Sequence, residues 1–321
     1  MSAATQSSST LQRVLRVASP LLLLAILAAL PFFDLGPNRT KVLFLTFLWI
    51  TTSIAWNILG GFTGQVSFGF AVFYGLGAYA TALAMGAGLS PYATYPIAGL
   101  VAAVASLLIG LPAFRLRGPY FAIATIGVSE ATRVIMTNLP FTGGASGYRI
   151  VEQGPFRQTD HYYSALVLAA VALVVSILVR RSRFGLGLRA IRDDQEAASD
   201  AGVNPYALKL AAHAVAAALT GAAGGVYARY ALFINPEGVF GFQRSVLILL
   251  LPVIGGVNTI WGPVIGGSFY GVIEEELAAR FPQLHLLLYG VLVILVILFE
   301  PGGVMGLLGR LRRLFQRKKA A

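Results

Sequence analysis

The stretch that decides the fold runs from residue 42 to residue 85 and reads VLFLTFLWITTSIAWNILGGFTGQVSFGFAVFYGLGAYATALAM. It holds no charged residue, and the glycine-rich segment Gly60–Gln65 joins its two apolar runs, Val42–Leu59 and Val66–Met85. A helix rises about 1.5 Å per residue, so a run of roughly 20 residues can cross a hydrocarbon core about 30 Å thick. The stretch therefore predicts two membrane-spanning helices linked by a tight turn.

Similar apolar runs follow along the rest of the chain. They are Pro20–Leu35, Tyr95–Phe114, Tyr120–Met136, Tyr163–Val179, Tyr206–Phe233, Ser245–Val257, Ile260–Ala279 and Leu284–Phe299. Of the 321 residues, 57% are hydrophobic and 12% are charged, whereas a soluble domain is about 25% charged. We therefore expect an all-α fold, a polytopic transmembrane helix bundle of about 8–10 spans with broken or re-entrant Gly-rich helices.

The basic residues lie mainly between these runs. With about ten crossings, 16 of the 24 Lys and Arg residues fall on one side of the membrane. Cytoplasmic loops are enriched in Lys and Arg, so we expect both ends inside, with cytoplasmic tails at 1–16 and 306–321 around a transmembrane domain at 17–305. The same placement accounts for the net charge of +11 without nucleic acid as a partner, and leaves membrane lipid as the main surroundings.

A second glycine pair, Gly255–Gly256, precedes a glycine-rich run late in the chain, as Gly60–Gly61 does near its start. An even number of spans separates the pairs, which predicts a parallel repeat; the alternative is a chance match in a chain with 36 glycines. Interrupted helices of this kind commonly line a substrate path. The polar residues that we expect along such a path are Thr63, Gln65, Ser67, Thr125, Glu130, Asn258 and Thr259.

The longest basic loop, residues 180–205, contains a short helix-favouring segment from Gln195 to Ala201, and Gly202 supplies its stop. Glu196 and Asp200 are four residues apart, so they share one helix face. Such a helix would lie on the cytoplasmic surface. The alternative is a solvated loop that only fixes the topology.

Several motifs in this order resemble one transporter family. They are residues 60–69 (GGFTGQVSFG), 115–123 (RLRGPYFAI), 130–133 (EATR), 142–147 (TGGASG) and the spacing E-A-A-x-x-x-G at 196–202. From residue 55 to residue 308 the chain is similar to the M-type permease of branched-chain amino acid (LIV-type) ABC importers.

The resemblance implies ATP-driven import of branched-chain or similar hydrophobic amino acids across a bacterial inner membrane. It implies a second homologous permease subunit, two cytoplasmic ABC ATPases that use the ATP, and a periplasmic or extracellular solute-binding protein. The helix that couples to the ATPases would comprise Glu196, Ala197, Ala198, Asp200 and Gly202, whose small alanines permit close docking. No cofactor is expected on this chain.

Other functions find less support in the sequence. None of the four lysines follows a glycine, so the chain has no phosphate-binding loop of the G-x-x-x-x-G-K type, and ATP hydrolysis must come from another subunit. Three scattered histidines predict neither a metal site nor an enzyme. A permease for urea or short amides remains an alternative. So does an ion-coupled secondary transporter that uses Glu130 or the acidic run Glu274–Glu276.

Overall fold

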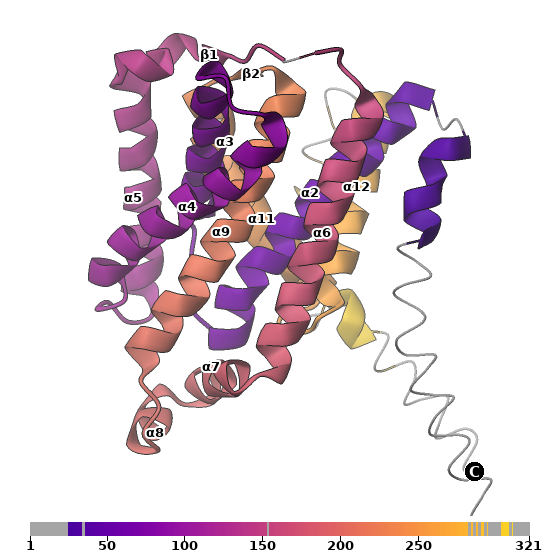
Figure 1. The fold of residues 1–321 in the computed structure, drawn as a ribbon. Coiled ribbons are helices and arrows are strands. Elements are labelled where there is room, and N and C mark those ends of the chain that lie inside the picture. The colour runs from indigo at the N-terminus through magenta and orange to yellow at the C-terminus, as the bar shows by residue number, and fades with distance from the viewer. Residues whose placement is uncertain are drawn as a thin grey trace, which may run out of the picture.

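The computed structural model describes residues 25–33, 36–152 and 154–281, with further positions at 284, 287, 290, 291, 294, 303–307 and 310. Almost all of these residues are helical (Figure 1). The helices are η1 (Leu30–Phe33), α2 (Gly36–Trp56), the π-helix η2 (Asn57–Gly61), α3 (Phe70–Gly86), α4 (Pro91–Ala113), α5 (Pro119–Asn138), η3 (Pro140–Thr142), η4 (Gly144–Ser146), α6 (Gln158–Arg181), α7 (Arg183–Asp193), α8 (Gln195–Asp200), α9 (Pro205–Ala231), α10 (Pro236–Phe240), α11 (Phe242–Gly255) and α12 (Gly262–Arg280). Two short strands, β1 (Tyr148–Arg149) and β2 (Phe233–Ile234), pair antiparallel.

The long helices run alternately between two ends of the molecule. We call them the α8 end, which carries α7 and α8, and the β end, which carries β1 and β2 (Figure 1). Helices α2, α4, α6 and α11 run toward the α8 end, and α3, α5, α9 and α12 return. At the α8 end, Tyr206 donates a hydrogen bond to the carbonyl oxygen of Leu111 at 2.8 Å, which ties the start of α9 to the end of α4.

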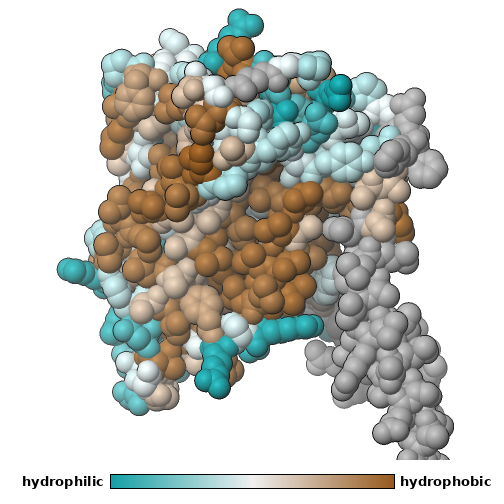
Figure 2. All heavy atoms as spheres, in the orientation of Figure 1, coloured by the Kyte–Doolittle hydropathy of each residue, from teal (hydrophilic) through white to brown (hydrophobic). Residues whose placement is uncertain are grey.

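Five of these segments are long and apolar enough to cross a membrane. They are Gly36–Gly61, Pro91–Ala113, Gln158–Arg181, Pro205–Ala231 and Pro236–Gly255. Figure 2 shows a hydrophobic surface across the middle of the molecule with hydrophilic residues toward both ends, as expected of a protein that spans a bilayer. The predicted all-α, polytopic bundle is confirmed, and the two-residue strands are its only β-structure in the described residues.

Eight of the ten apolar runs read from the sequence coincide with α2, α3, α4, α5, α6, α9, α11 and α12. The first run, Pro20–Leu35, is described only from residue 25 to residue 33, and the last, Leu284–Phe299, only at single positions. The total of 8–10 spans therefore stays a prediction. Most of the predicted tails, 1–16 and 306–321, lies outside the described residues.

Helix α9 packs closely against α3 and α4 because glycines on it carry no side chain. A Cβ atom at Gly221 would lie 2.7 Å from the carbonyl oxygen of Ala98 on α4, and one at Gly224 would overlap the backbone of Tyr74 on α3. On α12, a Cβ at Gly267 would lie 2.7 Å from the Cα atom of Ile50 on α2. These glycines thus allow close helix packing inside this subunit.

The two glycine pairs form hairpins that point the same way, as the parallel repeat predicted. The first connects α2 to α3 and the second connects α11 to α12, and both turn at the α8 end. The side chain of Asn57 joins them, since Nδ2 donates to the carbonyl oxygen of Thr259 and Oδ1 accepts from the backbone N–H of Asn258, both at 2.9 Å. Asn258 itself has a φ of 64°, in the left-handed region.

Candidate functional site at the α8 end

Helix α8 forms where the sequence predicted it, because both of its ends are capped. At its start, Asp194 Oδ1 accepts hydrogen bonds from the backbone N–H groups of Glu196 and Ala197 at 2.8 and 3.0 Å. An aspartate in this position satisfies N–H groups that a helix leaves unpaired. At its end, Gly202 has a φ of +85°, which favours glycine and stops the helix.

The predicted coupling residues divide between the surface of α8 and its buried side. Glu196, Ala197, Asp200 and Gly202 are exposed. Ala198 is only 5% exposed and faces the rest of the chain, which differs from the expectation that both alanines would meet a partner. A six-residue helix resting on the bundle must turn one side inward, and Ala198 occupies that side.

Arg117, in the loop between α4 and α5, pairs with Glu196 at 3.1 Å. Both side chains are largely exposed, 75% and 80%, so the pair contributes little to stability in water. Glu196, Asp200 and Arg117 also line an open cleft of about 450 Å³ beside α8. The exposed face of α8 therefore offers charged groups to a partner at no large cost to the fold.

Lys209 of α9 connects α8 to the first glycine hairpin. Its Nζ atom donates to the Oε1 atoms of Gln195 and Gln65 at 2.6 and 3.1 Å, although the residue is only 5% exposed. A buried ammonium group is costly unless such bonds satisfy it. One side chain thus ties together α9, the start of α8 and the hairpin.

Arg192 of α7 provides a second connection to the same hairpin. Its guanidinium donates to the carbonyl oxygen of Gly61 at 3.0 Å. Gly64 lies against it with a φ of +72°, and a Cβ atom there would be 3.3 Å from Arg192 Cγ. A displacement of α7 and α8 would therefore also displace residues 61–65.

The other predicted path residues of the first half lie close to this hairpin and make hydrogen bonds within the chain. Thr63 donates to the Leu59 carbonyl oxygen at 2.7 Å, and Ser67 Oγ accepts from the Gly69 N–H at 3.2 Å. Thr125 on α5 accepts from the Phe68 N–H at 3.0 Å. All of these residues are buried. They hold the hairpin in place and do not present free polar groups.

Glu130 lies apart from the other predicted path residues. It lies in the second half of α5, which ends at the β end, and forms an ion pair with Arg133. Arg133 also binds Glu237 of α10 at 2.7 Å. The arrangement fits a clamp between α5 and α10, although Glu130 remains half exposed, at 52%.

His213 of α9 is a packed core residue. It is 1% exposed, its Nδ1 lies 3.2 Å from the Ser106 carbonyl oxygen, and its ring meets Phe73 and Phe114 edge-on. Within the described residues, no group of His, Asp or Glu could hold a metal ion. Glu274 lines an open cavity described below, and the side chains of Glu275 and Glu276 lie outside the described residues.

Sequence reasoning missed the residues that connect these parts. The sequence predicts Lys209 only as one of the 16 basic residues on the inner side of the membrane. It predicts Arg192 only as part of the longest basic loop. Asn57, a polar residue inside an apolar run, was the one visible signal of a contact between hairpins, because a buried amide needs partners. Arg244 at the start of α11 carried no distinguishing pattern.

The structure has an apolar belt, long helices that alternate in direction, and a capped surface helix bound to a hairpin. These features define a polytopic α-helical membrane protein. Comparison with known proteins narrows the class. Residues 38–297 match the family described as branched-chain amino acid transport system / permease component. The chain belongs to this family.

Individual relatives agree with the family. The chain is 30% identical to the high-affinity branched-chain amino acid transport system permease protein LivM of Escherichia coli K12, over 94% of this chain and 77% of that protein. It is 24% identical to the probable branched-chain amino acid transport permease protein LivM of Methanocaldococcus jannaschii, over 65% and 66%. The permease protein LivH of Salmonella typhimurium matches at 30% identity over 44% and 46%. No solved structure matches significantly.

Proposed function

We propose that this chain is one of two related permease subunits of an ATP-driven importer for branched-chain or similar hydrophobic amino acids. The observation that carries the proposal is the connection of α8 to the hairpin between α2 and α3. An exposed, charged helix outside the apolar belt is hydrogen-bonded through Lys209 to a break in the membrane-spanning helices. A partner that pulls on α8 would thereby move residues inside the bundle.

Movement of α8 reaches the bundle by two routes that converge on one hairpin. One runs from Gln195 through Lys209 to Gln65, and the other from Arg192 to Gly61. Asn57 then connects this hairpin to the second one, between α11 and α12. ATP hydrolysis by two partner ATPases would therefore act on both halves of the permease. The chain itself binds no cofactor in this scheme.

The α8 end would lie in the cytoplasm of a bacterial cell, with the protein in the inner membrane and both chain ends inside. The support is the charge distribution, because Arg115, Arg117, Lys209 and the five arginines from Arg180 to Arg192 all belong to this end. A cysteine at Ser182 would then be labelled only from the cytoplasm, and one at Thr159 only from outside. The reverse labelling would overturn this orientation.

The remaining partners would meet other surfaces. A solute-binding protein would dock at the β end, where the loop from Asn138 to Tyr162 forms η3, η4 and β1. The second permease would cover the outer face of α5, where Gly127 is open and Glu130 is half exposed. A half-exposed carboxylate facing lipid would be costly, so protein or a water-filled path is expected there.

Uptake into proteoliposomes tests the proposal. They would contain this chain, the second permease and the ATPases, with ATP on the α8 side and the binding protein opposite. We expect leucine uptake that requires ATP and exceeds urea or acetamide uptake. Leucine uptake from a proton gradient alone would favour the ion-coupled alternative, and ATP-driven urea uptake without leucine uptake would favour the amide permease.

A further inference from the structure

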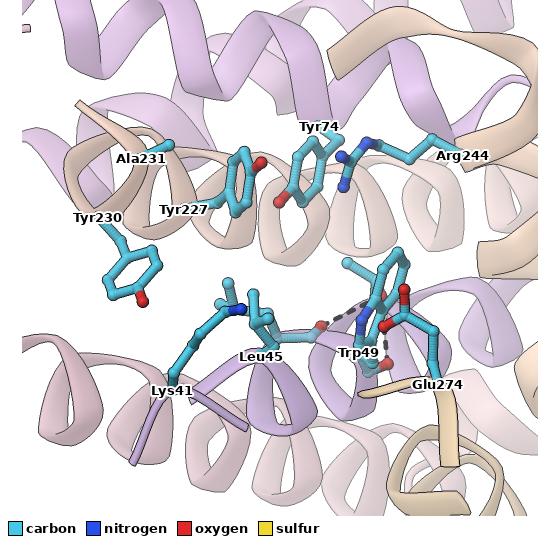
Figure 3. Close-up of a pocket in the computed structure, with 11 residues that line it drawn as sticks. Lys41, Leu45, Trp49, Tyr74, Tyr227, Tyr230, Ala231, Arg244 and Glu274 are labelled. Atoms are coloured by element: carbon cyan, nitrogen blue, oxygen red, sulfur yellow. Dashed lines mark hydrogen bonds between the residues drawn. The ribbon is translucent and has the colours of Figure 1, made fainter. Parts of the chain in front are cut away.

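Helices α2, α3, α9, α11 and α12 line an open cavity of about 310 Å³ in the half of the bundle nearer the β end (Figure 3). Leu45, Leu48 and Trp49 of α2 form an apolar wall, and Tyr74 and Tyr227 bring aromatic rings from α3 and α9. The volume lies at the small end of the range for ligand sites, about 300–1,000 Å³. It is lined as such sites usually are, by apolar groups with a few polar ones.

Arg244 extends along this cavity beside Tyr74 (Figure 3). Its guanidinium carbon lies 4.5 Å from the ring centre of Tyr74 and 5.2 Å from that of Tyr227, and its Nε donates to the Gly238 carbonyl oxygen at 2.9 Å. These contacts fix the side chain and leave its charge in the cavity.

Within the described part of the chain, Arg244 has no carboxylate partner, in contrast to two other arginines near the β end. Arg133 pairs with Glu130 and Glu237, and Arg229 pairs with Glu152 at 2.8 Å. Charged side chains inside a membrane-spanning bundle pair with one another or with backbone carbonyls. Arg244 has a backbone carbonyl and aromatic rings as partners, so no carboxylate of the described residues neutralises its charge, and that charge favours an anionic group in the cavity.

We infer that this cavity binds an aliphatic α-amino acid, with its carboxylate on the Arg244 guanidinium. A planar guanidinium matches a carboxylate through two parallel hydrogen bonds. The aliphatic side chain would lie against Leu45, Leu48 and the aromatic rings. Lys41 and Glu274 also line the cavity. The inference rests on the proposed function and adds to it a site and a chemical requirement, a free carboxylate.

Direct binding to the purified full-length chain in nanodiscs tests this requirement. The probes are L-leucine and L-leucinamide, which differ only in the carboxylate, and the variants are Arg244→Gln and, as the control, Arg39→Gln at the exposed start of α2. We expect leucine to bind at least tenfold more tightly than leucinamide. Arg244→Gln should abolish that difference, whereas Arg39→Gln should keep it.

A second variant covers the case in which Arg244→Gln does not fold. Leu45→Trp fills the cavity from the opposite wall while Arg244 and its contacts remain, and it should also weaken leucine binding at least tenfold. Equal binding of leucine and leucinamide to the unaltered chain would overturn the inference. So would unchanged leucine binding by either folded cavity variant, or no leucine binding at all.

Transport measurements separate failure of this inference from failure of the proposed function. If the reconstituted importer takes up leucine with ATP but Arg244→Gln leaves its apparent affinity unchanged, only the cavity assignment is wrong. If the unaltered importer takes up no leucine, the proposed function is wrong. We expect leucine uptake by the unaltered protein and an apparent affinity at least tenfold weaker in Arg244→Gln.

Discussion

Replacing Lys209 with methionine tests the connection between α8 and the first hairpin. Methionine keeps an unbranched side chain but loses both hydrogen bonds of Nζ. Gln195 lines the open cleft beside α8 and would regain water, whereas Gln65 is 9% exposed and would lose its donor. One unsatisfied buried group costs about 1–3 kcal/mol. We expect the free energy of unfolding to fall by about this amount, which leaves the protein folded.

The effect on transport should exceed the effect on abundance. A coupling free energy of about 1–3 kcal/mol corresponds to a factor of roughly 5–150 in an equilibrium between two states. In proteoliposomes, the ratio of leucine imported to ATP hydrolysed should therefore fall by at least about fivefold, while hydrolysis continues. Arg115→Met, which removes an exposed charge at the same end, is the control and should keep the ratio. An unchanged ratio in Lys209→Met would refute the idea that this side chain transmits movement.

Three further predictions concern docking and packing. Glu196→Lys with Ala197→Trp should abolish co-purification of the ATPases while membrane abundance stays normal, because both residues are exposed; retained co-purification would mean that α8 only anchors the loop. Gly224→Ala should lower the unfolding free energy by about 1–3 kcal/mol, since its methyl group would overlap the Tyr74 backbone, and Gly127→Ala, at an open position, should cause no loss in the same denaturation measurement. Asn57→Ala should cost about 1–3 kcal/mol and reduce transport, because it leaves buried groups of the second hairpin unpaired; stability equal to the unaltered chain would contradict the role of that amide.

The parts of the fold that follow from local sequence were predictable. Apolar runs of span length, the Asp194 and Gly202 caps of α8 and the shared orientation of the two glycine pairs all depend on residues near one another in the chain. The parts that depend on residues far apart were not. Gln65 and Lys209 are 144 positions apart, and no periodicity indicates that an amide and an ammonium group will meet. The sequence also does not predict which side of α8 is buried. Ala197 and Ala198 are the same residue type, and only the packing of α8 on the bundle determines which of them faces inward.

The predicted path residues illustrate why polarity inside a span is an ambiguous signal. Thr63, Ser67 and Thr125 are polar residues that the sequence predicts along a substrate path, because interrupted helices commonly line one. Each instead satisfies a backbone group of the interrupted hairpin, as any break in a helix within an apolar region requires.

A polar group whose hydrogen bonds are all made within the chain has no free donor or acceptor for a ligand. A charged group without a counter-charge can still form an ion pair with one. By that criterion we assign substrate selection to the cavity of Arg244, in the half of the bundle away from α8, and not to Thr63, Ser67 or Thr125. In the proposed scheme, force applied at α8 and recognition near the β end occupy opposite ends of the same helices.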